Sequence, residues 1–283
     1  MLGRHRFLET LTHFVLCMGV LIVVFPIYVA LVGASHTAQD MAQSPIPLWF
    51  GHETWNNLKT VFWGEGPGVT TQVPVSRMLW VSCVTAVSIA VGKIIISLLS
   101  AFAIVYFQFP FRRAVFWGIF ITLMLPVEVR IVPTYQVIAD FHMVNSFAGL
   151  TIPLIASATA TFLFRQFFLT VPDELAEAAK MDGATPMRFF WDILLPLSKT
   201  TIAALFVIQF IYGWNQYLWP LLISTEERMY PIVMGIRSMT AGADSQVQWN
   251  LVMATAMLAL LPPMLVVLGM QKWFIKGLVD TEK

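Results

Sequence analysis

The sequence predicts an all-α, polytopic membrane protein, and its composition and the spacing of its apolar runs support this class. Hydrophobic residues make up 58% of the 283 residues and charged residues only 12%, whereas soluble domains average roughly half apolar and about a quarter charged residues. The apolar residues gather in runs of about 20, the length of a helix that crosses a bilayer. No stretch alternates strictly between apolar and polar residues over about ten positions, so a membrane β-barrel is not supported.

Six apolar runs are long enough to span a membrane, so we expect a single transmembrane domain over residues 1–283. The predicted spans cover residues 13–33, 79–107, 115–135, 146–169, 201–224 and 251–272. The first run is longer than the roughly 7–15 apolar residues of a cleaved signal peptide. We therefore expect this helix to be retained; cleavage near residues 33–35, the alternative, would remove one span. Residues 34–77 are expected to be an irregular loop on the outer face.

Lysine and arginine predict the orientation, because cytoplasmic loops carry an excess of both. With a cytoplasmic N-terminus, the inner segments hold eleven of these residues and the outer segments four, and Lys93 and Arg130 lie within spans. The inner residues are Arg4, Arg6, Arg112, Arg113, Arg165, Lys180, Arg188, Lys199, Lys272, Lys276 and Lys283, and the outer ones are Lys59, Arg77, Arg228 and Arg237. We expect a protein of the cell inner (plasma) membrane with both termini in the cytoplasm.

One polar stretch, residues 173–196, separates the fourth and fifth predicted spans. Pro172 and Asp173 make a helix start with acids in the first turn, where the helix dipole favours them. Gly183 permits a positive φ that ends this helix. Thr185 and Pro186 supply an N-cap and a first-turn proline for a second helix. We therefore expect two short cytoplasmic helices that meet at a glycine turn.

The second of these helices carries an apolar side that is expected to fill a groove on a partner protein. Its side chains are Phe189, Phe190, Ile193 and Leu194. The alternative is an amphipathic hairpin that lies on the membrane surface.

The spacing of this stretch resembles the EAA loop of the membrane subunits of ATP-binding-cassette (ABC) importers. Its fixed positions are all matched here, at Glu177, Ala178, Ala179, Gly183, Ile193, Leu195 and Pro196. Segments such as 120–131, 157–168 and 210–222 are also similar to permeases of the carbohydrate-uptake branch, and within it to those of glycerol-3-phosphate importers.

The resemblance implies a MetI-like permease fold with a coupling loop formed by these seven residues. It implies three kinds of partner: a homologous second permease, an ATP-binding subunit dimer on which the loop docks, and a periplasmic substrate-binding protein. The implied substrate is sn-glycerol-3-phosphate or a related glycerophosphodiester. A sugar or polyol importer and an ion-gradient-driven secondary transporter stay open as alternatives.

No phosphate loop of the form G-x-x-x-x-G-K-[ST] occurs, since Gly92-Lys93 is followed by Ile94. A separate ATPase must therefore supply the energy, and we expect no catalytic residue in this chain. The five histidines form no cluster, so no metal is expected, and no cofactor is implied. The net charge of +1 argues against a nucleic-acid partner.

Ionisable residues inside spans are costly and usually face a water-filled path or the bundle interior. Lys93 lies in the second predicted span, and Glu128 and Arg130 lie in the outer half of the third. Asn215 and Gln216 reach a similar depth in the fifth. On one interpretation Arg130, together with Lys93, offers positive charge to an anionic phosphate substrate. On the other, each is satisfied by a neighbouring helix or by the second permease. For Asn215 and Gln216, path lining and interhelical hydrogen bonding are equally open.

Overall fold

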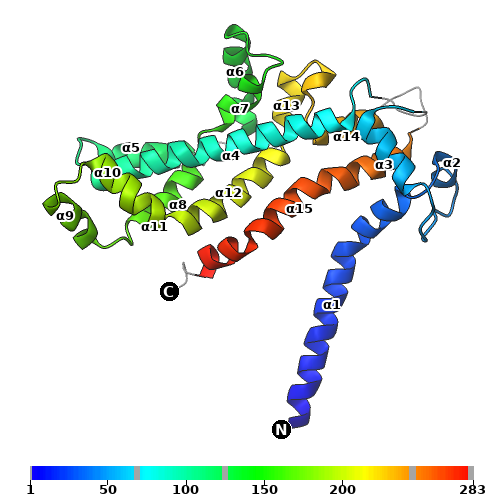
Figure 1. Cartoon of the computed structure of the whole chain (residues 1–283), viewed down its shortest axis with the longest axis horizontal. Helices are drawn as coiled ribbons and strands as arrows, with labels where there is room; N and C mark the ends of the chain where they lie inside the picture. The colour runs from blue at the N-terminus through cyan, green and yellow to red at the C-terminus, as the bar shows by residue number, and fades with distance from the viewer. Residues whose placement is uncertain (1, 67–70, 123–126, 242–246, 280–283) are drawn as a thin grey trace. The chain divides into compact units, whose positions relative to one another are not determined.

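A computed structural model describes residues 2–66, 71–122, 127–241 and 247–279, and every regular element in these ranges is helical (Figure 1). Side chains are described for the same ranges except residues 2–8, 127–128 and 274–279. The α-helices are α1 (Leu2–Gly33), α2 (Ala38–Met41), α3 (Thr54–Trp63), α4 (Val75–Tyr106), α5 (Arg112–Ile121), α6 (Val127–Asp140), α7 (Phe147–Thr151), α8 (Ala158–Phe168), α9 (Asp173–Met181), α10 (Pro186–Phe189), α11 (Leu195–Leu197), α12 (Lys199–Trp214), α13 (Leu218–Ile223), α14 (Ile232–Thr240) and α15 (Trp249–Val279). Short helical turns are η2 (Ile152–Leu154), the π-type η3 (Phe190–Leu194) and η4 (Glu227–Met229). The predicted all-α class is confirmed.

Three helices in the described part of the chain are long and apolar enough to cross a membrane. They are Glu9–Gly33, Val75–Tyr106 and Trp249–Trp273, which correspond to the first, second and sixth predicted spans. Two bent helix pairs also qualify, Phe147–Leu154 with Ala158–Phe168 at 49° and Pro186–Leu197 with Lys199–Trp214 at 72°. The described residues thus contain three candidate spans, or up to five if each bent pair is one span.

Two predicted spans are not continuous helices. The run 146–169 breaks between Leu154 and Ala158, where Ser157 begins α8 by accepting a hydrogen bond from the Ala160 amide at 3.2 Å. The run 201–224 breaks after Trp214, the last residue of α12, and resumes at Leu218. The run 115–135 falls on α5 and α6, and the connecting residues 123–126 lie outside the described ranges. Hydropathy alone does not register these breaks, because the breaking residues are themselves weakly polar or apolar.

The chain divides into two compact units, and the first consists of Met1–Arg77 with Gly235–Leu261. Here a buried amide on α3 joins the end of α1 to the start of α15. Asn57 Nδ2 donates to the carbonyl oxygens of Ala34 and His36 at 2.9 and 2.8 Å, and its Oδ1 accepts from Asn250 Nδ2 at 3.0 Å. The segment 34–77, predicted to be irregular, contains the helices α2 and α3, and the bonds of Asn57 hold α3 to this framework.

Helix α2 begins with a capping box between Thr37 and Asp40. The Asp40 amide donates to Thr37 Oγ1 at 3.2 Å, and the Asp40 carboxylate accepts from both the hydroxyl and the amide of Thr37, at 2.8 and 3.2 Å. These bonds hold the pKa of the Asp40 carboxyl below its usual value of 3.8. The hydrogen bond from the Thr37 hydroxyl has the larger effect, and the bond from the Thr37 amide has the smaller one.

The second unit, Met78–Met234 with Pro262–Lys283, is organised on α4, which contributes to two separate hydrophobic clusters. Toward its start, Val81 and Ile89 pack with α7 and α13, where Trp219 Nε1 donates to the Gly149 carbonyl at 3.0 Å. Toward its end, Leu98 and Phe102 pack with α8, α12 and the 179–194 segment. Helix α12 also lies close to α4, since a Cβ on Gly213 would come within 2.9 Å of the Ala86 Cα atom.

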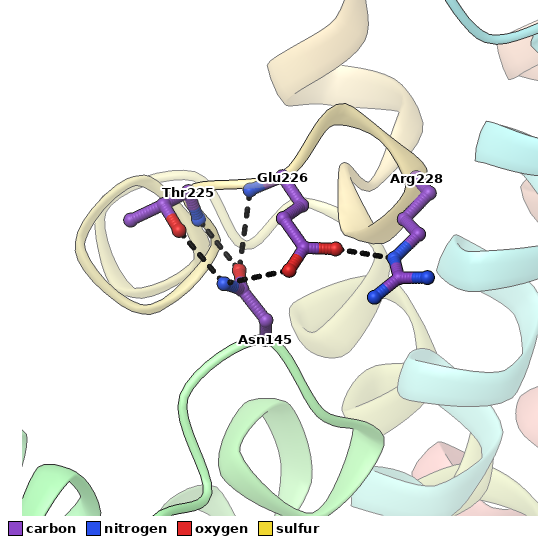
Figure 2. Close-up of polar contacts among 4 residues, drawn as sticks. All are labelled: Asn145, Thr225, Glu226 and Arg228. Atoms are coloured by element: carbon purple, nitrogen blue, oxygen red, sulfur yellow. Dashed lines mark hydrogen bonds and ion pairs between the residues drawn. The ribbon is translucent and has the colours of Figure 1, made fainter.

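An asparagine in the left-handed conformation ties the turn after α6 to the turn after α13 (Figure 2). Asn145 Oδ1 accepts from the amides of Thr225 and Glu226 at 2.7 and 3.2 Å, and its Nδ2 donates to Thr225 Oγ1 at 2.7 Å. Glu226 in turn pairs with Arg228. These bonds hold α13 beside α7 in addition to the apolar contacts beneath them.

Candidate functional site

Two places in the second unit gather the residues that the sequence singled out: the hairpin of residues 173–196 and a cavity beside α4. In the hairpin, α9 begins at Asp173 and ends before Gly183, which has φ +73°. Thr185 Oγ1 then accepts from the Arg188 amide at 3.3 Å and Pro186 occupies the first turn of α10. The expected pair of short helices around a glycine turn is therefore present (α9 to α11 in Figure 1).

The turn side of the hairpin is open. Glu177, Ala178 and Gly183 are exposed, and a Cβ built on Gly183 would meet no atom within 4 Å. Ala179 alone of this set is buried, in the cluster that ends α4. An exposed carboxylate on α9 and an uncrowded left-handed glycine after it leave a surface that another protein can approach closely.

The predicted apolar docking side is wrong, because most of it is buried within this chain. Phe189, Phe190 and Leu194 are at most 6% exposed. Their rings and methyl groups pack on α4: Phe190 lies 5.0 Å from Phe102, and Phe189 lies 5.2 Å from Tyr106, between ring centroids. These side chains fasten the hairpin to the span and are unavailable to a partner.

Other apolar side chains of the hairpin face outward, and the sequence reasoning missed them. Met181 is 83% exposed, Trp191 58% and Met187 48%. Met187 and Trp191 are four residues apart, and the Trp191 ring packs edge-on against the buried Phe190 ring, with 5.5 Å between centroids. That spacing is visible in the sequence, but it cannot say which of two apolar faces the chain covers itself.

The last three predicted coupling residues lie where the hairpin joins α12. Ile193 and Leu195 are half-buried, and Pro196 is exposed. Leu195 and Pro196 line an almost wholly apolar groove of about 450 Å³ together with Trp191 and Lys199. The hairpin and α12, the helix that carries Gln209, thus line one groove together.

The cavity measures about 560 Å³ and is lined by two cations from different helices, Lys93 on α4 and Arg130 on α6. Its other polar lining includes Ser100, Thr122, Ser157, Thr159, Thr161, Gln209 and Tyr212. No carboxylate is among the described side chains that line it. The side chain of Glu128, the predicted neighbour of Arg130, lies outside the described part of the chain.

Lys93 is 6% exposed and is held by two groups of α12. Its Nζ donates to Gln209 Oε1 at 3.1 Å and lies 3.5 Å from the centre of the Tyr212 ring. Gln209 and Tyr212 were missed by sequence reasoning, although their spacing of three residues places them on one face of a helix. The pattern that would have indicated Gln209 and Tyr212 is an amide and an aromatic side chain three residues apart in an apolar span.

The break before α8 also faces this cavity. Ser157, Ala158 and Thr159, the N-cap and first two residues of an eleven-residue helix, are among its lining residues. The N-terminus of a helix carries a partial positive charge of about one half. Among the described groups that line the cavity, two cationic side chains and a helix N-terminus supply positive charge, which favours an anion.

Asn215 and Gln216 are not brought to this cavity. Asn215 is exposed at the end of α12, and Gln216 donates from Nε2 to the Tyr212 carbonyl at 3.1 Å. Both residues lie directly after the end of α12 at Trp214, and neither is among the lining residues of the cavity. Of the predicted polar set with described side chains, only Lys93 and Arg130 share the cavity.

Among the described residues, no group of three or more histidine, cysteine, aspartate or glutamate side chains could hold a metal ion. The geometry instead offers hydrogen-bond donors and positive charge around a partly enclosed space. Such a site can bind and orient an anionic solute.

Comparison with known proteins agrees with this geometry. Residues 93–280 match the family described as binding-protein-dependent transport system inner membrane component. The chain is 57% identical over all 283 residues, 100% of both chains, to the sn-glycerol-3-phosphate transport system permease protein UgpE of Pectobacterium atrosepticum. It is 59% identical to the permease of the same name from Brucella melitensis over 273 residues, 96% of each chain.

A solved bacterial ABC transporter involved in the import of the acidic polysaccharide alginate has the same fold. The TM-score is 0.78 at 18% identity, and the match covers 95% of this chain and 97% of that one. The family match covers most of the chain, and the relatives match it from end to end. The chain therefore belongs to the inner membrane components of binding-protein-dependent transport systems.

Proposed function

We propose that this chain is one of two permease subunits of an ATP-driven importer for sn-glycerol-3-phosphate. The full-length similarity to permeases of that name supports the substrate. The observation that carries the proposal for this chain itself is the cavity lined by Lys93 and Arg130, with no described carboxylate to neutralise them.

The charge of the cavity favours a phosphate over a neutral sugar. Lys93 is buried and Arg130 is exposed. Moving an ammonium group out of water costs roughly several kcal/mol unless an opposite charge compensates it. A phosphate ester accepts hydrogen bonds from both cations and is itself compensated for its lost hydration. A sugar would fill the same volume and leave the buried Lys93 without an opposite charge among the described side chains. The Lys93–Arg130 cavity is accordingly proposed as the part of the translocation path that meets the phosphate group. Three further residues are proposed to line the path only because of their position along the predicted spans: Glu128, Asn215 and Gln216.

The membrane topology of the proposal has six spans, with the third formed by α5 and α6 and both termini in the cytoplasm. The excess of lysine and arginine in the inner segments, eleven residues against four, supports this orientation. It places the 173–196 hairpin in the cytoplasm, on the side where ATP is available.

The hairpin is proposed as the coupling element that docks on one subunit of an ATPase dimer. Glu177 and Gly183 would contribute charge and close approach, while Met181, Met187 and Trp191 supply the exposed apolar contact that the buried phenylalanines cannot. ATP-driven closure of the dimer would move the hairpin. The rings of Phe189 and Phe190 on Tyr106 and Phe102 would pass this movement to α4, which carries Lys93.

The remaining partners of the proposal are a homologous second permease, which completes the path, and a periplasmic binding protein, which delivers the substrate. Transport is by alternating access: the path opens outward with the ATPase dimer closed and inward after hydrolysis. An ion-gradient-driven carrier would transport without the ATPase, so the two can be separated directly.

Uptake of labelled sn-glycerol-3-phosphate by the whole reconstituted complex tests the function. We expect uptake that requires both ATP and the binding protein. Arg130→Gln should reduce it at least about tenfold, the loss expected when one charged contact worth at least ~1.4 kcal/mol is removed. Uptake by the intact complex that survives inactivation of the ATPase would show a different energy source. Equal transport by the wild-type and Arg130→Gln complexes would show that the cavity does not meet the phosphate.

A further inference from the structure

The buried ammonium group of Lys93 contacts two neutral groups, an amide oxygen and an aromatic ring. A lysine ammonium group has three N–H donors. Gln209 Oε1 accepts one at 3.1 Å, and the face of the Tyr212 ring lies 3.5 Å from Nζ. Both partners are neutral, and no ion pair of Lys93 occurs among the described side chains. These contacts stabilise the charge through a hydrogen bond and a cation–π interaction, but they leave it in place.

The helices that carry these residues are held close together near the cavity. Gly213 lies one turn beyond Gln209 on α12, and a Cβ there would meet the Ala86 Cα at 2.9 Å. Ala86 lies two turns before Lys93 on α4. Because α12 and α4 approach this closely, the Gln209 amide stays within hydrogen-bond distance of the lysine.

We propose that Gln209 is a positioning residue that determines the charge specificity of the path. By holding Lys93 with a neutral oxygen, it keeps a full positive charge available in the cavity, beside Arg130 and the N-terminus of α8. The phosphate group of the substrate then pairs with Lys93, as a carboxylate does in an ordinary buried ion pair. This inference rests on the proposed function and names an anionic phosphate ester as the substrate class. A carboxylate at position 209 would neutralise Lys93 in advance.

Two variants at one position separate charge from packing. Gln209→Met removes the hydrogen bond and adds no charge, whereas Gln209→Glu keeps an oxygen acceptor and adds a negative charge. We expect uptake of sn-glycerol-3-phosphate by the whole reconstituted complex to fall moderately with methionine. With glutamate it should fall at least about tenfold further, equivalent to ~1.4 kcal/mol. The loss should appear in the KM for uptake, while ATP hydrolysis by the complex persists in both variants.

A charge exchange provides the rescue. In the double variant Lys93→Gln with Gln209→Lys, the amide and the ammonium exchange positions that are 3.1 Å apart in the wild type, and Tyr212 remains one turn away on α12. We expect this variant to take up the substrate within roughly threefold of Gln209→Met, as a compensated pair should. Lys93→Gln alone should transport as poorly as Gln209→Glu.

The outcomes are separable from those of the function test. If the wild-type complex takes up the phosphate ester but Gln209→Glu and Gln209→Met transport equally, the charge at position 209 is irrelevant and the inference is overturned. Failure of the exchange variant, with normal membrane insertion and ATP hydrolysis, also overturns it. If the wild-type complex does not transport the phosphate ester at all, the proposed function itself is wrong.

Discussion

The hydrogen bonds of Asn145 predict how much free energy holds the turn before α7 to the turn after α13 (Figure 2). Replacement by alanine removes three bonds of 2.7–3.2 Å to Thr225 and Glu226 and a longer fourth one, from Nδ2 to Glu226 Oε1 at 3.5 Å. A hydrogen bond contributes about 0.5–1.5 kcal/mol net, and partly exposed ones lie at the lower end, so their loss should cost ~2 kcal/mol. Alanine must also adopt the φ of 57° found at this position, which adds ~1 kcal/mol.

Glycine at the same position isolates the second contribution. Asn145→Gly loses the same bonds but adopts a positive φ freely, so it should cost only ~2 kcal/mol. Hydrogen exchange of the amides of Thr225 and Glu226 measures the local opening that these energies control. We expect exchange to accelerate roughly 150-fold in the alanine variant and roughly 30-fold in the glycine variant, at ~1.4 kcal/mol per tenfold change.

A carboxylate at position 145 tests the direction of each bond. Asn145→Asp still accepts from the two backbone amides, but it cannot donate to Thr225 Oγ1, and it places a second negative charge near Glu226 Oε1, which lies 3.5 Å from Asn145 Nδ2 in the wild type. Adding Glu226→Gln should restore much of the protection, because the repulsion is removed. Unchanged exchange at Thr225 and Glu226 in Asn145→Ala would refute the reasoning, as would identical exchange in the alanine and glycine variants.

Three further predictions address other elements. Gly149→Ala should lower the free energy of unfolding of the purified complex by ~1–3 kcal/mol or more, because the new Cβ would lie 2.2 Å from the Met143 carbonyl oxygen. An unaltered unfolding temperature would contradict this contact. Gly183→Pro should leave the complex inserted and hydrolysing ATP but without uptake, since proline cannot adopt φ +73° and no neighbouring atom is displaced. Gly183→Asn, which tolerates this φ, is the matched control, and normal uptake by the proline variant would rule out the coupling role. The lowered pKa of Asp40 means that its contribution to α2 is fully present above pH 3.8 and is lost as the pH falls through the lower folded-state pKa. The protection of amides in residues 38–42, measured as the exchange rate relative to that of the unstructured chain at the same pH, should therefore be constant from neutral pH to about pH 4 and should fall below it, and Asp40→Asn should abolish that fall.

The sequence determined the class of this protein and the local form of its hairpin. Runs of about 20 apolar residues leave helices as the only practical way to satisfy the backbone in lipid. Pro172, Gly183, Thr185 and Pro186 act through their own φ angles and side-chain bonds, so the two short helices and the turn follow from neighbours in sequence. The family likeness rested on the same hairpin, and the matched family and full-length relatives confirm it.

Tertiary structure decided which faces are covered and which polar residues meet. Phe189 and Phe190 were predicted to be free for a partner, yet they are buried on Phe102 and Tyr106, because a hydrophobic face shows only that burial is favourable and does not identify the surface that buries it. Lys93 and Gln209 are 116 residues apart, and no local rule brings them together. Their contact depends on the close packing of α4 and α12 at Gly213. Contacts between distant segments are set by packing in three dimensions, which the periodicity of a single chain does not encode.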